Sequence, residues 1–220
     1  MKLVSLWSNR YSLPSDAGEI MLHKDKHTHG HGKQEKPSSG HDFFGHGDAI
    51  RAALDRRLPR KAIRALDVGT GFGRNAVFLA HHLARGSHVL SVDPSEGSLK
   101  QGEEAVKAAG LGGRVTMVSG VAEALPFADD TFDVAIAVML FHHLVDLVPA
   151  LREMARVTRL GGKLLLADWA PTAHLLPFAV EHRAEDFFTA RAVVNVLREI
   201  GLAPDAEQHP EWYVIEGVKS

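Results

Sequence analysis

The feature that most constrains this chain is a strand-like run that enters three alternating glycines. The run is LDVGTGFGRN, in which an apolar stretch around Asp67 leads into glycines at positions 69, 71 and 73. Glycine tolerates positive φ and lets a ligand approach the backbone closely. A helix is predicted directly afterwards, over 75–84, and its first turn would offer free N–H groups and a partial positive charge. The run therefore predicts a strand, a turn and a helix that together bind a carboxylate or a phosphate.

The same alternation of apolar patterns continues along the chain and predicts an α/β fold. Helices are expected at 48–58, 75–84, 95–109, 147–158 and 189–200. Strands are expected at 62–69, 88–93, 114–120, 132–139, 163–169 and 212–218, with 206–209 as a partner for the last one. Strands that alternate with helices indicate a doubly wound, mostly parallel, seven-stranded sheet with helices on both faces. Ligands of such sheets sit at the carboxyl ends of the strands.

Composition narrows the classes of function. The chain has 220 residues, 45% of them hydrophobic, and a formal charge of −2, which suits one domain with an extension and gives no field that would attract nucleic acid. Because there is no cysteine, disulfides, thiolate zinc sites and cysteine nucleophiles are excluded. No run approaches the roughly 18 apolar residues of a membrane span, and no signal peptide is visible, so a cytoplasmic location is expected.

Residues 1–47 differ from the remainder, because they are rich in His, Lys, Gly and Ser and show little periodicity. They are interpreted as an N-terminal extension that serves as a lid, and residues 48–220 as the ligand-binding domain. Within the extension, His27, His29 and His31 alternate, so an extended chain would place three imidazoles on one side and make a divalent metal site. A mobile part of the lid, or a direct contact with a substrate, explains the same segment.

The spacing of the glycines argues against a dinucleotide. The dinucleotide pattern G-x-G-x-x-G needs a glycine at position 74, where this chain has Arg74. Asp67 would repel a pyrophosphate but would pair with an ammonium group. Asp93 ends the second strand, where an acid accepts hydrogen bonds from ribose hydroxyls. The site is therefore predicted to bind a nucleoside joined to an amino acid, and S-adenosylmethionine is such a molecule.

Several motifs in order carry a family resemblance. The stretches LDVGTGFGRNAVFLA, SVDPSEGSL, GVAEALPFADDTFDVAIAVMLFHHL and LGGKLLLADW resemble the class I S-adenosylmethionine-dependent methyltransferases. They resemble most the branch that includes the ubiquinone and menaquinone biosynthesis methyltransferases. The similarity covers roughly 62–170, and FTARAVVNVLREIGL with WYVIEGV resembles the C-terminal helix and strand of that branch. The resemblance implies a Rossmann-like methyltransferase fold.

The resemblance also implies roles for particular residues. The glycine turn, Gly69, Thr70, Gly71 and Gly73, would line the methionine part of the cofactor, with Asp67 at its amino end. Asp93 would hold the ribose, and Pro94 would flank the adenine. After the third strand the family pattern G-D-A-E reads Gly120-Val121-Ala122-Glu123. Because Val121 replaces the acid, the adenine would rely on the backbone of Ala122 or on Glu123, which is equally explained as a surface residue.

The same resemblance places Met139 beside the cofactor and the pair His142 and His143 near the mouth where the acceptor enters. Either histidine could act as a general base, or both could pack the loop. Asp168, at the carboxyl end of the fifth strand, faces the acceptor region, and His174 and His182 lie behind it. The N/D-P-P-Y/F signature of nucleic-acid methyltransferases is absent from the sequence. A small-molecule acceptor is therefore expected, and its identity and the oligomeric state are not readable.

Two functions of other classes compete with methyl transfer. The first is a non-catalytic regulatory or metal-handling protein that binds S-adenosylmethionine or a metal through the His-rich extension. The second is a nicotinamide-dependent oxidoreductase, which Arg74 disfavours. Turnover of S-adenosylmethionine with any acceptor would separate a methyltransferase from both.

Overall fold

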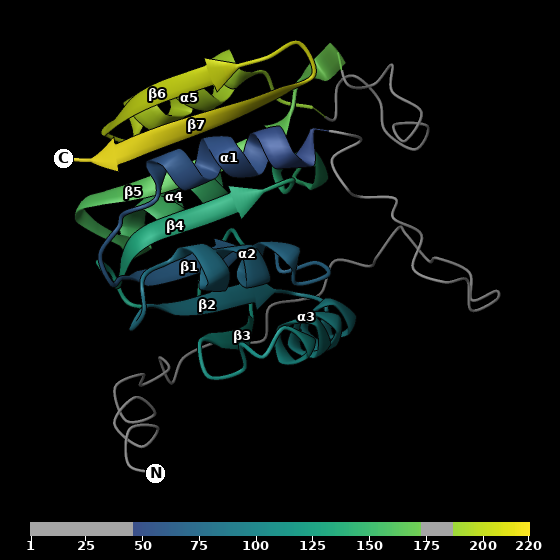
Figure 1. The fold of residues 1–220 in the computed structure, drawn as a ribbon. Coiled ribbons are helices and arrows are strands. Elements are labelled where there is room, and N and C mark those ends of the chain that lie inside the picture. The colour runs from purple at the N-terminus through teal and green to yellow at the C-terminus, as the bar shows by residue number, and fades with distance from the viewer. Residues whose placement is uncertain (1–45, 173–186) are drawn as a thin grey trace. The chain divides into compact units, whose positions relative to one another are not determined.

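The computed structural model of the chain describes residues 46–172 and 187–220. These residues hold a sheet of seven strands, shown in Figure 1. The strands are β1 (Arg64–Val68), β2 (His88–Asp93), β3 (Val115–Ser119), β4 (Phe132–Val138), β5 (Thr158–Trp169), β6 (Leu202–Gln208) and β7 (Trp212–Lys219). The predicted lid and its boundary after residue 47 fall almost wholly outside the described residues, so both stay predictions.

The strand order confirms the predicted doubly wound sheet. The order is β3-β2-β1-β4-β5-β7-β6, and β1 pairs in parallel with both β2 and β4. Pairing is also parallel between β2 and β3 and between β4 and β5, whereas β7 runs antiparallel to β5 and β6. The chain reverses its winding direction between β1 and β4, and sheets of this kind bind ligands at the ends of the two strands where the reversal occurs.

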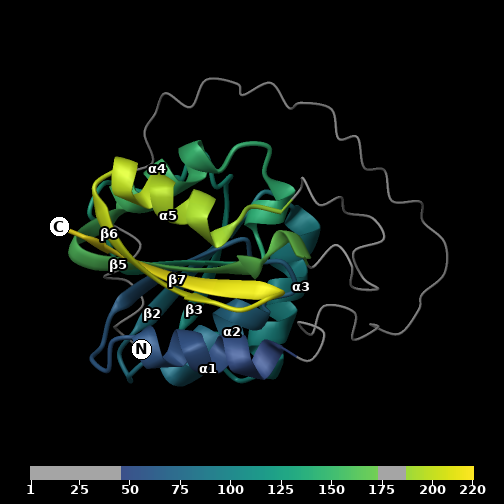
Figure 2. The same ribbon diagram turned by 90° about the horizontal axis from the view of Figure 1, so that it is seen from above.

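Helices cover both faces of the sheet, as Figure 2 shows. One face carries α1 (Gly47–Arg57), α2 (Arg74–His82) and α3 (Glu96–Ala108), and the other carries α4 (Leu147–Val157) and α5 (Ala190–Glu199). β4 is buried along nearly its whole length, as expected for a strand covered on both sides. None of the helices within 46–172 and 187–220 is long and apolar enough to cross a bilayer.

Local sequence accounts for the ends of several helices. Ser95 caps α3 by accepting a hydrogen bond from the N–H of Ser98, and Gly110 follows the helix in the left-handed conformation. Thr189 caps α5 through the N–H of Ala192, and Gly201 takes a φ of 86° after it. These caps account for helices that begin and end close to the predicted ranges 95–109 and 189–200.

Two predicted strands have different bounds in the structure. β5 begins at Thr158 rather than at Lys163, and it includes the Gly161-Gly162 pair. The pairing register between β4 and β5 shifts at this place, and a Cβ on Gly162 would lie 2.9 Å from the carbonyl oxygen of Asp133. The predicted partner of β7, 206–209, is wrong at both ends, because β6 spans Leu202–Gln208. Pro204 is accommodated because β6 is an edge strand.

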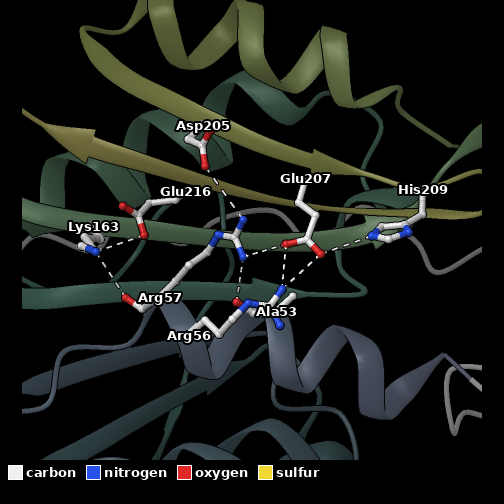
Figure 3. Close-up of polar contacts among 8 residues, drawn as sticks. All are labelled: Ala53, Arg56, Arg57, Lys163, Asp205, Glu207, His209 and Glu216. Carbon is white, nitrogen blue, oxygen red and sulfur yellow. Dashed lines mark hydrogen bonds and ion pairs between the residues drawn. The ribbon is translucent and has the colours of Figure 1, made fainter.

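A network of charged side chains ties α1 to the antiparallel end of the sheet, as drawn in Figure 3. The carboxylate of Glu207 on β6 accepts hydrogen bonds from Arg57 at 3.0 Å and from Arg56 at 3.0 Å. Lys163 on β5 donates to the carbonyl oxygen of Arg57 at 3.3 Å and to Glu216 on β7 at 3.0 Å. The helix that precedes β1 is therefore anchored to strands more than a hundred residues later in the chain.

Candidate active site

The predicted cofactor residues gather at the carboxyl ends of β1, β2 and β4. The glycine turn follows β1, and the N–H groups of Gly69 and Thr70 both donate to the carbonyl oxygen of Val92 on β2. A Cβ on Gly69 would lie 3.2 Å from Cδ1 of Leu140, in the loop that follows β4. The turn after β1 and the loop after β4 are therefore in direct contact at the switch point of the sheet.

All three glycines of the turn have positive φ, but their surroundings differ. Gly73 is the N-cap of α2, and a Cβ at this position would lie 2.7 Å from the Cα of Gly102 on α3. Close packing of the two helices thus accounts for Gly73 without any ligand. Gly71 has a φ of 46°, and a Cβ there would meet nothing within 4 Å. Of the three, Gly71 is the glycine whose Cα faces open space.

Asp67 lies beneath this turn and is fully buried. Its Oδ2 accepts a hydrogen bond from the hydroxyl of Ser91 at 2.6 Å, and Ser91 contacts the hydroxyl of Thr70 at 2.7 Å. Its Oδ1 has no hydrogen-bond partner among the described residues. Burial raises the pKa of Asp67 to about 7, the bond from Ser91 opposes that rise, and the charge of Asp93 adds to it. The site therefore holds a buried carboxylate oxygen that lacks a donor.

Asp93, at the end of β2, links two backbone segments of the site. Its Oδ2 accepts from the N–H of Gly71 at 3.0 Å, and its Oδ1 accepts from the N–H of Ser95 at 2.9 Å. A carboxylate oxygen accepts more than one hydrogen bond, so these contacts leave acceptor capacity for a ligand hydroxyl. Pro94 beside it is exposed.

The segment after β3 holds the residues predicted to contact adenine. Gly120 donates to the carbonyl oxygen of Asp93 at 3.3 Å, which places this segment next to the end of β2. Val121 is 38% exposed, Ala122 is buried, and the side chain of Glu123 is exposed. The described contacts include no hydrogen bond that would direct the carboxylate of Glu123 toward the end of β2. Its role as a replacement acid stays a prediction.

The loop after β4 begins with an unusual backbone conformation. Met139 has a φ of 59°, which a residue with a long side chain seldom adopts, and its N–H donates to the carbonyl oxygen of Ala167 at 2.8 Å. Left-handed non-glycine residues cluster at functional sites, where the surrounding structure holds them in place. The turn at Met139 directs the following residues, Leu140 to His143, across the end of β5.

Within this loop the two predicted histidines differ in their contacts. Nδ1 of His142 lies 2.8 Å from Oδ1 of Asp168, and both side chains are almost fully buried. The centroid of the His143 ring lies 4.0 Å from that of the His142 ring. The pairing of His142 with Asp168, like the roles of Ser91 and Gly102, was missed in the sequence. These residues come together because the ends of adjacent strands lie side by side, and no spacing within the sequence predicts those contacts.

The metal prediction falls outside the described residues, because His27, His29 and His31, like His174 and His182, lie outside 46–172 and 187–220. Within those two ranges no group of three or more His, Asp or Glu side chains is placed to hold an ion.

Comparison with known proteins agrees with this architecture. Residues 66–166 match the family model described as a methyltransferase domain. The chain is 36% identical over 158 residues to a demethylmenaquinone methyltransferase of Mycolicibacterium paratuberculosis. The aligned region covers 68% of this chain and 63% of that protein. It is 34% identical over 126 residues to the ubiquinone/menaquinone biosynthesis C-methyltransferase UbiE of Geobacter sulfurreducens, covering 53% and 49% respectively. The chain thus spans about half to two thirds of the length of these curated relatives.

Solved structures share the fold. A SAM-dependent methyltransferase from Aquifex aeolicus superposes with a TM-score of 0.68 at 20% identity, covering 76% of this chain and 88% of that one. The PH0226 protein of Pyrococcus horikoshii also gives a TM-score of 0.68 at 20% identity, covering 82% and 92%. At this level of identity the likeness establishes the fold alone.

Proposed function

Because the chain belongs to the class I S-adenosylmethionine-dependent methyltransferases, related to UbiE, we propose that it transfers a methyl group from S-adenosylmethionine to a small-molecule acceptor. The observation that carries the proposal is Oδ1 of Asp67, a buried oxygen without a hydrogen-bond partner among the described residues, in a site whose glycine turn leaves open space at Gly71. A buried carboxylate without a donor is costly, and an ammonium group supplies what it lacks. The residues present thus fit the amino-acid end of this cofactor.

The remaining residues of the site divide the cofactor between them. Asp93 would hold the ribose hydroxyls while it keeps the N–H of Gly71 in place, and Met139 would lie beside the reacting end. Val121 and Ala122, with Pro94, would bound the adenine. When bound, the cofactor supplies an electrophilic methyl group on a sulfonium, and the protein contributes by holding the acceptor in line with it and by excluding water.

We propose the acceptor class from the relatives. Because two of them are named for ubiquinone, menaquinone or demethylmenaquinone, a quinol ring is the first acceptor to test. Residues 1–47 would cover the site, and a cytoplasmic location suits this substrate class. The alternative of a regulatory metal-binding protein rests on the histidines at 27, 29 and 31. Zinc uptake by the full chain, compared with a form lacking residues 1–36, tests it.

Calorimetric titration with S-adenosylhomocysteine tests the assignment of the cofactor site. We expect Gly71→Leu to weaken binding by about 100-fold, because its side chain enters the space that the ligand needs. The matched control is Gly110→Leu, which introduces the same side chain at another left-handed position with open surroundings. Asp93→Ala should weaken binding comparably. Wild-type protein that takes up no S-adenosylhomocysteine would overturn the proposed function, and unchanged affinity in both variants would overturn the residue assignments.

A further inference from the structure

We propose that Asp168 is a positioning residue that fixes His142 as the base of the reaction, and that the acceptor is therefore a molecule that loses a proton during methylation. This inference rests on the proposed function. It concerns the acceptor side of the site, which is formed by the ends of β4 and β5, whereas most of the proposed cofactor residues lie at the ends of β1, β2 and β3.

Three hydrogen-bond donors surround the carboxyl group of Asp168. Its Oδ2 accepts a hydrogen bond from the N–H of Phe141 at 2.7 Å. Its Oδ1 accepts from the N–H of Trp169 at 2.7 Å and lies 2.8 Å from Nδ1 of His142. The Asp168 side chain is only 2% exposed. Three donors that converge on one buried group suit an ionised carboxylate, which only accepts hydrogen bonds, and an amide here would turn its NH₂ group toward a donor.

The contact with Asp168 determines which ring nitrogen of His142 carries the proton. Because the carboxylate only accepts, the contact with Asp168 requires a proton on Nδ1 of His142. In the neutral ring Nε2 then carries the lone pair, so the tautomer is the one in which Nε2 accepts a proton. Phe187 stacks against the ring with centroids 5.7 Å apart, which further restricts its rotation. Backbone and aromatic contacts thus hold both the tautomer and the orientation of His142.

The third feature is the location of His142. His142 is two residues after Leu140, whose side chain packs against Gly69 in the cofactor turn. The left-handed turn at Met139 brings this loop over the end of β5, where Asp168 is found. His142 therefore belongs to the loop that contacts the cofactor turn through Leu140 and the end of β5 through Asp168. If Asp168 served only to hold the loop in place, its hydrogen bonds with the two backbone N–H groups would be enough. The additional contact with the imidazole of His142 indicates a role in orienting that ring.

The titratable groups around the pair are compatible with this role. His143 lies against the His142 ring, and Tyr213 on β7 is paired in register with Asp168. Burial first, and then the charge of Asp168, raise the pKa of the Tyr213 hydroxyl well above its usual range. Tyr213 therefore stays neutral, and Asp168 is the negatively charged group closest to His142 among the described residues.

The proton balance identifies the class of acceptor. The O–H bond of a phenol or an enol breaks, and its proton moves to Nε2 of His142. An electron pair of the acceptor oxygen, or of the conjugated carbon, forms the bond to the methyl carbon, the carbon–sulfur bond breaks, and its pair stays on sulfur. The imidazolium then releases its proton to water. A tertiary amine is methylated without losing a proton and would gain nothing from the pair.

The experiment uses the full chain, with 1,4-naphthohydroquinone as the hydroxyl probe and N,N-dimethylaniline as the amine probe. In His142→Asn, Nδ2 takes the place of Nδ1, so the hydrogen bond to Asp168 is kept and Nε2 is lost. We expect methylation of the hydroquinone to fall by about 100-fold or more in kcat, while the affinity for S-adenosylhomocysteine stays within about threefold. His88→Asn, the same change at the amino end of β2, is the matched control and should keep wild-type turnover.

Two further measurements separate positioning from a structural effect. The wild type should lose kcat/KM on the acid side of neutrality, because a protonated imidazole accepts no proton, and His142→Asn should lack this limb. Nitrogen NMR of the histidine rings should show Nδ1 of His142 protonated in the wild type and a changed tautomer in Asp168→Asn, together with a lower kcat.

The outcomes distinguish failure of the proposed function from failure of the roles proposed for His142 and Asp168. Failure of the wild type to bind S-adenosylhomocysteine would remove the proposed function and this inference with it. Normal cofactor binding with undiminished turnover in His142→Asn would overturn the inference alone. Methylation of the amine only, or of neither probe, would also overturn it, as would an unchanged tautomer and unchanged kcat in Asp168→Asn.

Discussion

At the scale of single residues, Asp67 makes the site costly to build without a ligand. The carboxyl group is fully buried, and burial is the largest cause of its raised pKa of about 7. One oxygen is bonded to Ser91 and the other has no donor among the described residues. Such an arrangement lowers the free energy of unfolding of the free protein and strengthens its interaction with a cationic ligand. Functional sites commonly combine these two effects.

This trade predicts how the stability of the free protein depends on pH. The folded state keeps the Asp67 proton up to about pH 7, whereas the unfolded chain loses it near the ordinary pKa of 3.8. The folded state therefore binds more protons in this window, and the contribution of Asp67 falls as pH rises from 3.8 to 7. Asp67→Asn removes this loss, so at pH 8 it should raise the free energy of unfolding by up to roughly 4 kcal/mol.

Urea unfolding of both proteins at pH 5 and pH 8 measures the effect, with Ser91 left intact in each. The same variant should bind S-adenosylhomocysteine at least about 10-fold more weakly, because an amide offers no charge to an ammonium group. A variant that is less stable than the wild type at pH 8 would contradict the account, as would one that keeps full affinity.

At the scale of secondary-structure elements, the glycine turn depends on how α2 and α3 pack. Gly73 begins α2 and approaches Gly102 on α3, and a Cβ on Gly102 would in turn lie 2.6 Å from Cγ2 of Thr70. The two helices thus meet through a pair of glycines directly behind the ligand-facing part of the turn. Two glycines are needed here because the backbones come too close for a methyl group.

Gly73→Ala should therefore lower the free energy of unfolding by more than the cost of placing an alanine at the positive φ of this position. A left-handed alanine costs about 1 kcal/mol, and the overlap with the backbone of Gly102 adds about 1–3 kcal/mol. Gly110→Ala is the matched control, because Gly110 has a similar φ of +72° and nothing within 4 Å of a Cβ. Thermal and urea unfolding compare the two variants. Equal losses would show that the contact between the helices carries no strain.

At the scale of the whole molecule, charges join the beginning of the described chain to its end. Glu207 on the edge strand accepts from Arg56 and Arg57 of α1 and contacts His209 at 3.2 Å. Burial alone would raise the pKa of Glu207, but the bonds from His209, Arg57 and Arg56 together hold that pKa below its usual value. The network thereby fixes α1 across the antiparallel strands while the parallel strands carry the site.

Glu207→Gln should lower the free energy of unfolding at pH 7 by about 1 kcal/mol, because the partly buried ion pairs become weaker hydrogen bonds. Since the folded pKa of Glu207 is lowered, its contribution is present above the ordinary value of 4.5 and is lost as pH falls through the lower folded value. The difference between the variant and the wild type should therefore shrink as pH falls below 4.5. Asp48→Asn is the control, because Asp48 pairs with Arg51 on an exposed surface. A difference that persists at pH 3 would contradict the assignment.

The sequence by itself determined the order of strands and helices, the ends of α3 and α5, and the place of the glycine turn. These follow from local periodicity, from capping side chains and from glycines, whose effects act over a few residues. The edges of β5 and β6 escaped prediction, because pairing with a neighbouring strand extends a strand beyond its own apolar run.

Only the tertiary structure decided which residues of the site act together. It separated Gly71, which faces open space, from Gly73, which packs on α3, although both occupy the same repeat in the sequence. It also brought Asp168 to His142 across 26 positions of the chain. Parallel pairing sets the carboxyl ends of β4 and β5 side by side, and no spacing within either strand encodes that neighbour. The glycine turn is local in origin, whereas the pair proposed to move a proton exists only in the folded sheet.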